Sequence, residues 1–173
     1  FLHTSCRTYP KGTKVQTFTL KDGEVLQDKA QKLSEQLMYP KAYTENPEIK
    51  ESILTAHSSL NMTLPSGEKA IRNLSIHVSE IDSANYSSIM RNLIVKISFD
   101  GIQTVCVPLS DLTGAGMGAP AVRSYYLEAD GKEYSRLRFV MPYRREASIK
   151  VENISGNSAK IKIEACISAW KWY

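Results

Sequence analysis

The stretch that decides the fold is NLIVKISFDGIQTVCVPLSDLTGAGMGAPAVRSYYLEADGKEYSRLRFVMPY, residues 92–143. At 93–99 every second residue, beginning with Leu93, is apolar, which is the period of a half-buried strand. Asp100-Gly101 predicts a two-residue hairpin turn, because glycine takes positive φ at little cost and aspartate tolerates it. A return strand is therefore expected at 102–109.

A glycine-rich segment at 111–120 follows this hairpin. It carries three glycines in five residues and has no hydrophobic period, so it is predicted to be a loop. Strands are expected next at 122–128 and 134–140, joined by a turn at Asp130-Gly131. Pro142 is expected to end the run, because proline has no N–H to donate to a strand ladder.

The rest of the chain predicts more strands and one helix. Further strands are expected at 15–20, 53–64, 70–78, 147–152 and 159–172. The segment 79–88 has little apolar content and is predicted to be a loop. A helix is expected between an N-cap at Asp22 and Pro40, and its apolar stripe must dock on something because a helix this short is marginal alone.

Side-chain alternation assigns faces to two of these strands. In the strand 70–78, one face is expected to hold Ile71, Asn73, Ser75 and His77, and the other Arg72, Leu74, Ile76 and Val78. In the last strand, one face is expected to hold Ile161, Ile163, Ala165, Ile167 and Ala169.

About eight short strands with regularly spaced turns predict an all-β fold, a β-sandwich with jelly roll as the preferred topology. A strand and helix appendage is expected at 1–40, a linker at 41–50, where the composition turns polar, and the main domain at 51–173. A chain of 173 residues is long enough for one well-buried core. It begins with Phe1 and stops inside a predicted strand, so it is expected to be a fragment.

Composition excludes several classes of protein. The net charge of +4 comes from 22 basic and 18 acidic residues spread along the chain, which argues against a nucleic-acid partner. No segment approaches the roughly 20 apolar residues that cross a bilayer. Cys6, Cys106 and Cys166 are widely spaced, so they are expected to be buried thiols rather than a disulfide framework or a zinc site.

Few residues suggest chemistry. His3, His57 and His77 are isolated and lack metal-ligand spacing, so no metal and no cofactor is predicted. Glu128, Asp130 and Glu133 cluster at a turn where solvated acids are common, although a catalytic pair is recognised only by its separation in space. No convincing helix follows Gly114-Ala115-Gly116, so this is not a phosphate-binding loop; a tight crossover and a ligand-facing loop both remain open.

The arginines and sequons give a second, weaker signal. A sugar- or anion-binding face and a set of merely solvated side chains are both compatible with Arg123, Arg136, Arg138, Arg144 and Arg145, and solvation is the commoner outcome. Asn-x-Ser/Thr sequons occur at Asn61, Asn73, Asn85 and Asn153, and they matter only in a glycosylating host.

Several motifs together resemble a known family. They are, in chain order, FDG at 99–101, TV at 104–105, VPLSD at 107–111 with Gly114 and Gly116, VMPY at 140–143, and a strand that ends in EN at 152–153. Their order and spacing are similar to glycoside hydrolase family 172, formerly domain of unknown function 2961. Upstream, RTYPKGTKV at 7–15 with Thr17 and Phe18 resembles the segment that closes the preceding jelly roll in long members from Bacteroides-like bacteria, which would make 1–40 the end of that jelly roll plus a linking helix.

The resemblance implies a function as well as a fold. Family members are built from jelly rolls, assemble as trimers or hexamers, and include α-D-fructofuranosidases and α-D-arabinofuranosidases that act with retention of configuration. Retention needs two carboxyl groups about 5 Å apart. The family's Gly-Glu-Gly-Glu-like strand and Gly-Thr-Gly-Thr-Glu-Asp-Tyr segment do not occur here, so the catalytic glutamates are expected beyond Tyr173 and this chain is expected to hold no catalytic residue.

In that case the chain supplies a scaffold and an active-site wall. The resemblance makes the candidate substrate-binding residues Asp111, Gly114, Gly116, Arg123 and Tyr143. The expected partners are the remainder of the parent polypeptide, further copies in a homo-oligomer, and a carbohydrate ligand. By the same resemblance the protein is expected to be periplasmic or secreted.

The loop departs from the family pattern and keeps two functions open. Where the family has Gly-Asp-Phe-Phe-Gly, this chain has Ser110-Asp111-Leu112-Thr113-Gly114, so two aromatic side chains that can stack on a sugar are missing. One hypothesis is a non-catalytic jelly roll of a glycoside hydrolase. The other is a carbohydrate-binding or structural assembly module, and a binding module is expected to expose an aromatic platform such as Tyr125, Tyr126 or Tyr143.

Overall fold

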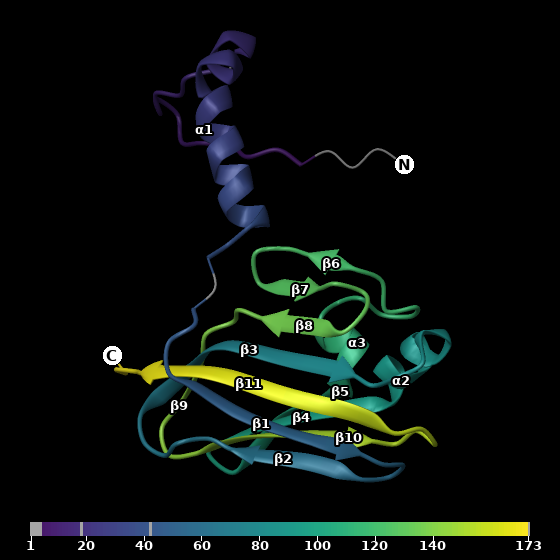
Figure 1. Ribbon diagram of the computed structural model, residues 1–173. Helices are drawn as coiled ribbons and strands as arrows, with labels where there is room; N and C mark the ends of the chain where they lie inside the picture. Colours follow the sequence, from purple (N-terminus) through teal and green to yellow (C-terminus); the bar gives the residue numbers. More distant parts are fainter. Residues whose placement is uncertain (1–4, 18, 42, 173) are drawn as a thin grey trace. The chain divides into compact units, whose positions relative to one another are not determined.

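The computed structural model describes residues 5–17, 19–41 and 43–172 (Figure 1). The chain divides into two compact units, residues 1–35 and residues 36–173, and each is described by itself. Of the residues named in the sequence analysis, Phe1, His3, Phe18 and Tyr173 lie outside the described residues.

Helix α1, Leu20–Met38, begins in the first unit and continues past Glu35, the last residue of that unit. Its N-cap is Thr19 rather than the predicted Asp22. The Thr19 N–H donates to the Asp22 carboxylate at 2.8 Å and the Asp22 N–H donates to Thr19 Oγ1 at 3.4 Å, which is a reciprocal capping box. The Thr19 hydroxyl group also donates to the Asp22 carboxylate at 2.6 Å, and this bond, together with the one from the Thr19 N–H, lowers the pKa of Asp22. The strand predicted at 15–20 is absent from its described residues, and no described residue of α1 is buried.

The second unit is a sandwich of two antiparallel sheets. The seven-stranded sheet contains β1 (Pro47–Leu54), β3 (Lys69–Ser79), β6 (Val122–Arg123), β7 (Leu127–Ala129), β8 (Tyr134–Leu137), β9 (Met141–Tyr143) and β11 (Ala159–Ala169). The four-stranded sheet contains β2 (Ser59–Thr63), β4 (Leu93–Phe99), β5 (Ile102–Pro108) and β10 (Ala147–Asn153).

The strand pairing is nested, and nesting defines the topology. Strand β1 pairs with β11, β2 with β10, β3 with β8, and β4 with β5, so the first main strand pairs with the last and the second with the second last. A long hairpin rolled up in this way is a jelly roll. The predicted all-β jelly-roll sandwich is confirmed, with β6 and β7 added as a hairpin beyond β8.

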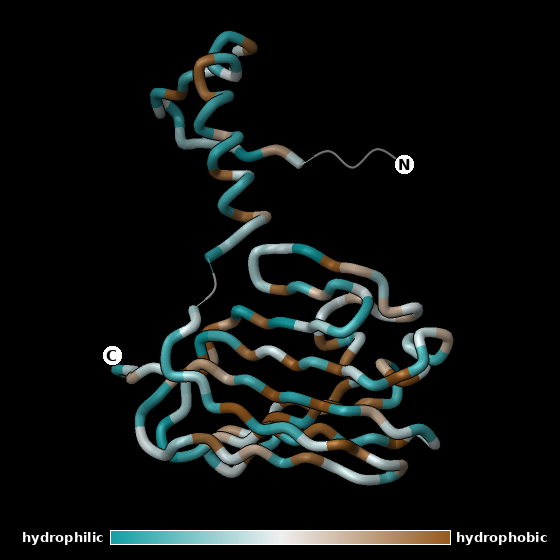
Figure 2. Tube along the Cα trace, viewed as in Figure 1, coloured by the Kyte–Doolittle hydropathy of each residue, from teal (hydrophilic) through white to brown (hydrophobic). Residues whose placement is uncertain are grey.

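The core lies between the sheets. Along β10 buried and half-buried residues alternate over its whole length, and on β4 Leu93, Val95 and Ile97 are fully buried while Phe99 is half-buried. Figure 2 shows this alternation of hydrophobic and hydrophilic residues along the strands. On β11 the predicted inward face is confirmed up to Ile167, whereas Ala169 is exposed and ends the strand.

Strand β3 departs from simple alternation at Arg72. Its register on β11 runs from Asn73, opposite Cys166, directly to Ile71, opposite Ile167, so Arg72 is the extra residue of a β-bulge. Ile71 is therefore fully buried in the core with Leu74, although alternation alone placed it on the other face. The predicted assignment of Ile71 and Arg72 to faces was wrong for this reason.

Several predicted boundaries also differ. The strand predicted at 53–64 is two strands, β1 and β2, and β1 starts at Pro47, inside the predicted linker. The strand predicted at 122–128 is the hairpin of β6 and β7. Pro142 does not end the run: it lies inside β9, which pairs with β3 alone and so has a free edge, and edge strands tolerate proline.

Helical segments replace parts of two predicted loops. In the segment 79–88, the short helices η1 (Ser83–Asn85) and α2 (Tyr86–Asn92) form, and the Ala84 N–H donates to the Asp82 carboxylate at 3.0 Å. In the glycine-rich segment, the first residues form α3 (Leu109–Leu112). No helix in the described part of the chain is long and apolar enough to cross a membrane.

The burial of individual groups corrects one further expectation and bears on the sequons. Cys6 and Cys106 are exposed and only Cys166 is buried, so the expectation of buried thiols was wrong for two of the three cysteines. Of the sequon asparagines, Asn73 and Asn153 are buried. The buried Asn153 side chain donates hydrogen bonds to the carbonyls of Leu54, Thr55 and Asn157. It therefore links these segments of backbone and is not available as a glycosylation acceptor.

The predicted hairpin at Asp100-Gly101 is confirmed, with φ of 53° and 87°. The Asp100 carboxylate also ties this turn to the connection between β9 and β10. It accepts hydrogen bonds from the backbone N–H groups of Arg144, Arg145 and Glu146, the shortest being 2.7 Å from Arg145. These hydrogen bonds, chiefly the one from Arg145, lower the pKa of Asp100 from its ordinary value of 3.8.

We expect Asp100→Asn to lower the free energy of unfolding at pH 7 and to matter less in acid. A carboxyl group whose pKa is lower in the folded state stabilises the fold above its unfolded pKa, and that stabilisation is lost as pH falls through the folded pKa. Asparagine tolerates the positive φ, so the turn is kept. Urea unfolding between pH 7 and pH 3 measures the gap between the two proteins, and a gap that does not shrink below about pH 4 contradicts the assignment.

We expect Gly131→Ala to destabilise the protein more than Gly116→Ala. Both glycines have positive φ, 72° and 64°, which costs alanine about 1–2 kcal/mol. At Gly131 an added Cβ also lies 2.9 Å from the backbone nitrogen of Ala121, whereas nothing lies within 4 Å at Gly116. The clash brings the Gly131 loss to about 3 kcal/mol. Equal losses in urea unfolding of the two variants contradict this packing of the β7–β8 turn.

Candidate functional site

The predicted glycine loop folds back on helix α3. The N–H groups of Ala115 and Gly116 both donate to the carbonyl of Ser110, at 2.9 and 3.1 Å, and Gly114 takes a φ of 74°. Asp111, on α3, forms an ion pair with Arg91 of α2. The loop is thus fastened by its own backbone and by one surface ion pair.

Tyr143 is part of the core. It is fully buried, its hydroxyl donates to the carbonyl of Pro65 at 2.7 Å, and its ring stacks on Phe99 with centroids 6.5 Å apart. Burial raises the pKa of Tyr143 to about 12. As a buried side chain, Tyr143 does not present the aromatic platform that the sequence suggested.

Arg123 belongs to a cluster of arginines around Glu128. Arg123 on β6 and Arg136 on β8 each approach the Glu128 carboxylate at 3.8 Å, and Arg138 forms an ion pair with the same carboxylate. Three guanidinium groups therefore share one carboxylate. The proposed candidate residues Asp111, Arg123 and Tyr143 each engage a different partner, namely Arg91, Glu128 and Pro65.

The other members of the predicted sets lie elsewhere or have structural roles. Arg145 donates its guanidinium to the carbonyl of Asp100, and Arg144 lies over the ring of Trp172 at 4.8 Å. Asp130 accepts the backbone N–H groups of Lys132, Glu133 and Tyr134, each at 2.9 Å, and so closes the β7–β8 turn. Only Arg123, Arg136 and Arg138 of the predicted arginine face are brought together around Glu128.

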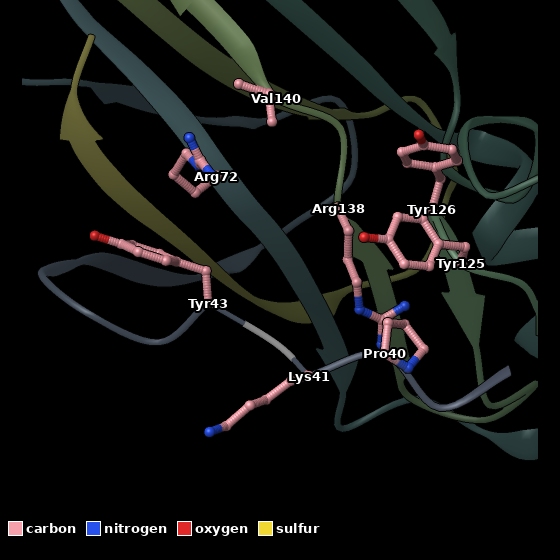
Figure 3. Close-up of a pocket in the computed structure, with 8 residues that line it drawn as sticks. All are labelled: Pro40, Lys41, Tyr43, Arg72, Tyr125, Tyr126, Arg138 and Val140. Atoms are coloured by element: carbon pink, nitrogen blue, oxygen red, sulfur yellow. The ribbon is translucent and has the colours of Figure 1, made fainter. Parts of the chain in front are cut away.

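Next to the Glu128 cluster lies a cavity of about 240 Å³ (Figure 3). Its described lining residues are Pro40, Lys41, Tyr43, Arg72, Tyr125, Tyr126, Arg138 and Val140. Figure 3 shows Arg138, Tyr125 and Tyr126 on one side of the cavity and Arg72 and Tyr43 on the other. The lining combines cations and aromatic rings, and no carboxylate is among its described residues.

Aromatic side chains form an exposed cluster at this cavity. The rings of Tyr126 and Phe139 stack in parallel at 4.9 Å, and Tyr125 meets Tyr126 edge-on at 4.9 Å. Tyr125 is 44% exposed and Tyr126 49%. Both come from the turn between β6 and β7, where an exposed pair of tyrosines costs no core packing. The predicted exposed platform is thus present at Tyr125 and Tyr126.

The β-bulge on β3 places the second arginine. Because Arg72 is the extra residue of the bulge, its side chain lines the cavity while Ile71 fills the core. The Arg72 guanidinium lies 5.8 Å from the centre of the Tyr43 ring. Sequence reasoning missed Arg72, Tyr43 and Phe139. The only signal for Arg72 was a charged residue in an otherwise buried strand.

Arg138 is the most buried of the three arginines around Glu128. Its side chain is 10% exposed, and one of its terminal nitrogens binds Glu128. Its Nε and Nη1 have no hydrogen-bond partner among the described residues. Neighbouring Arg136 differs, because its Nε donates to Ser75 Oγ at 3.3 Å. Burial lowers the pKa of Arg136.

The chemistry of the site follows from these groups. Over the described ranges, no three or more histidine, cysteine, aspartate or glutamate side chains gather to hold a metal ion. The cavity offers guanidinium donors, tyrosine hydroxyl groups and flat aromatic faces. Such a surface is suited to bind a polar ring that carries hydrogen-bond acceptors.

The fold and this cavity define a jelly-roll domain with a cavity lined by aromatic and cationic side chains. A family model described as GH172 domain-like matches residues 46–166, from the start of β1 into β11. The chain therefore belongs to this glycoside hydrolase-related family, and the resemblance noted in the sequence is confirmed. No curated protein sequence matches the chain.

We expect Glu128→Gln to lower the free energy of unfolding by about 1–3 kcal/mol, because three guanidinium groups lose their shared counter-charge. The control is Glu152→Gln, whose carboxylate pairs with Lys96 at a more exposed position and which is expected to lower the free energy of unfolding by clearly less. Urea unfolding measures both variants, and equal losses contradict a central role for Glu128.

Proposed function

We propose that this domain is a non-catalytic, glycan-binding jelly roll of a glycoside hydrolase-like protein. The observation that carries the proposal is the cavity of about 240 Å³ with two exposed tyrosines and two arginines in its lining. Aromatic faces stack on the C–H faces of sugar rings, and arginine donates to sugar oxygens. The volume is below the roughly 300–1,000 Å³ of sites for larger ligands, which favours one ring or the end of a chain.

The proposal places hydrolysis outside this cavity. Retaining hydrolysis uses two carboxyl groups about 5 Å apart. The described lining of the cavity has none, and nearby Glu128 is held by three arginines. We propose that other segments of the parent polypeptide, or other subunits, supply the carboxylates, and that the parent acts on α-furanosides such as fructo- or arabinofuranosides with retention. The loop 111–120 then serves as a wall of that active site.

Two further parts of the proposal concern assembly and location. Family membership supports a homo-oligomer, a trimer or a hexamer, in the periplasm or outside the cell. Exposed Ile49 and Ile53 on edge strand β1 and exposed Ile102 on edge strand β5 offer apolar contacts for it. The same residues favour a second candidate function, a structural assembly module without glycan binding.

We expect the purified protein to bind a glycan without hydrolysing it, and Tyr126→Ala to weaken that binding about tenfold because a stacking face is lost. The matched control is Tyr9→Ala, since Tyr9 is 56% exposed and lies outside the cavity lining. Calorimetric titration with arabino-, fructo- and pyranosyl oligosaccharides measures binding, and chromatography of the same mixtures measures free sugar.

The outcomes separate the two functions. Release of free sugar from an α-furanoside contradicts the non-catalytic assignment. If no glycan binds and native mass measurement gives a closed oligomer, the assembly module is the correct function. Equal loss of binding in Tyr126→Ala and Tyr9→Ala contradicts the assignment of the cavity.

A further inference from the structure

We propose that the cavity binds an acidic glycan, with the carboxylate of a uronic-acid-type sugar on Arg138 and Arg72. This inference rests on the proposed function, because it names the class of glycan that the same cavity takes. Under this inference the cavity is expected to prefer a charged sugar to a neutral one. A neutral furanose carries no charge that needs two guanidinium groups.

The charge of the lining supports an anionic ligand. The cavity is lined by Lys41, Arg72 and Arg138, with no acidic residue among its described lining residues. In the adjoining cluster one carboxylate, Glu128, is shared by three arginines, so positive charge remains in excess there as well. Uncompensated cations in a half-enclosed site attract an anion, and the planar guanidinium matches the geometry of a carboxylate.

Arg138 gives the sharpest argument. Its side chain is nine-tenths buried, yet Nε and Nη1 find no acceptor among the described residues. Leaving donors of a charged group buried without acceptors costs free energy, and an acceptor brought by a ligand recovers it. Arg136, in the same cluster, does not share this property because Ser75 accepts from its Nε. Of the two, only Arg138 lines the cavity, and it is the one with buried donors that have no acceptor among the described residues.

The position of Arg138 also explains how the site is reached. A second cavity, of about 210 Å³, is lined by Met38, Tyr39, Pro40, Arg123, Glu128, Arg136 and Arg138. Pro40 and Arg138 line both cavities, so the Arg138 side chain forms part of the wall between them. The Nε and Nη1 atoms of Arg138 are buried under neighbouring atoms. A carboxylate therefore reaches them only after side chains in the wall between the two cavities move. Ligand binding then joins the two cavities around the guanidinium group.

The aromatic rings favour a sugar over a small free anion. Tyr125 and Tyr126 offer a stacking surface on the same side as Arg138, and Arg72 with Tyr43 lies across the cavity (Figure 3). A uronic acid unites a ring with apolar C–H faces and a carboxylate on one edge. A sulfated sugar has the same two parts, but its bulkier anionic group needs more room than a carboxylate in a cavity of about 240 Å³.

The test is a calorimetric titration of the full chain with trigalacturonate and, separately, with galactotriose, at low and at high salt. We expect trigalacturonate to bind at least about tenfold more tightly, with an affinity that falls as salt rises. Arg72→Gln is expected to abolish most of this preference, because it weakens trigalacturonate binding far more than galactotriose binding. Arg138→Lys, which keeps the charge but not the planar fork, is expected to act in the same direction.

The control is Arg145→Gln, which removes one positive charge from the connection between β9 and β10 and is not in the cavity lining. It is expected to bind trigalacturonate as the unchanged protein does. Thermal unfolding shows whether Arg138→Lys folds, and Arg72→Gln keeps the test decisive if it does not.

Each result has one meaning. Equal affinity for the acidic and the neutral trisaccharide overturns the acidic-glycan assignment and leaves the proposed glycan-binding function in place. A sulfated galactotriose is titrated in the same way, and if it binds more tightly than trigalacturonate, the choice of a carboxylate as the bound anion is overturned. Binding of no saccharide at all overturns the proposed function itself, and the inference with it.

Discussion

The ladder between β3 and β11 is the constraint on which the rest of the structure depends. Strand β3 lies between β11 and β8, and its residues are buried on both faces over most of its length. One face supplies Leu74, Ile76 and Val78 to the core. The other carries Ser75, which accepts a hydrogen bond from Arg136. The bulge at Arg72 makes both uses compatible, because it turns one charged side chain outward without removing Ile71 from the core.

The hairpin of β6 and β7 builds on this frame. It extends the sheet beyond β8 and so brings Arg123 and Glu128 beside the arginines of β8 and its end. A carboxylate in the middle of three guanidinium groups allows them to lie close together at a tolerable cost. The turn between β6 and β7 also supplies Tyr125 and Tyr126 of the cavity lining. The β6–β7 hairpin is therefore part of both the sheet and the cavity. No residue of the glycine-rich loop is among the described lining residues of the cavity.

The sequence predicts the sandwich well because its signals are local and periodic. Alternation at 93–99 and the Asp100-Gly101 turn fix a hairpin without reference to the rest of the chain, and both are confirmed. The site depends on non-local facts. A bulge is defined by the partner strand, so Arg72 could not be assigned a face from β3 alone. Tyr143 is an aromatic residue of the kind that stacks on sugars, yet it is buried in β9, where it pairs with Lys69 of β3. Glu128 is recognisable as the centre of the arginine cluster only once β7 and β8 are paired.

The charges that line the cavity bear on whether it is suited to hold the catalytic acid of a glycoside hydrolase. A general acid in glycoside hydrolysis must hold its proton near neutral pH, which requires an apolar or negatively charged surrounding that raises its pKa. A carboxyl group placed among Arg72, Arg138 and Lys41 meets the opposite condition, because positive neighbours favour its ionised form. The same surroundings favour a bound carboxylate that stays charged. These charges support the proposal that the cavity holds an anion rather than donates a proton, and that acid catalysis, in a parent protein that hydrolyses glycosides, takes place at a site of different charge.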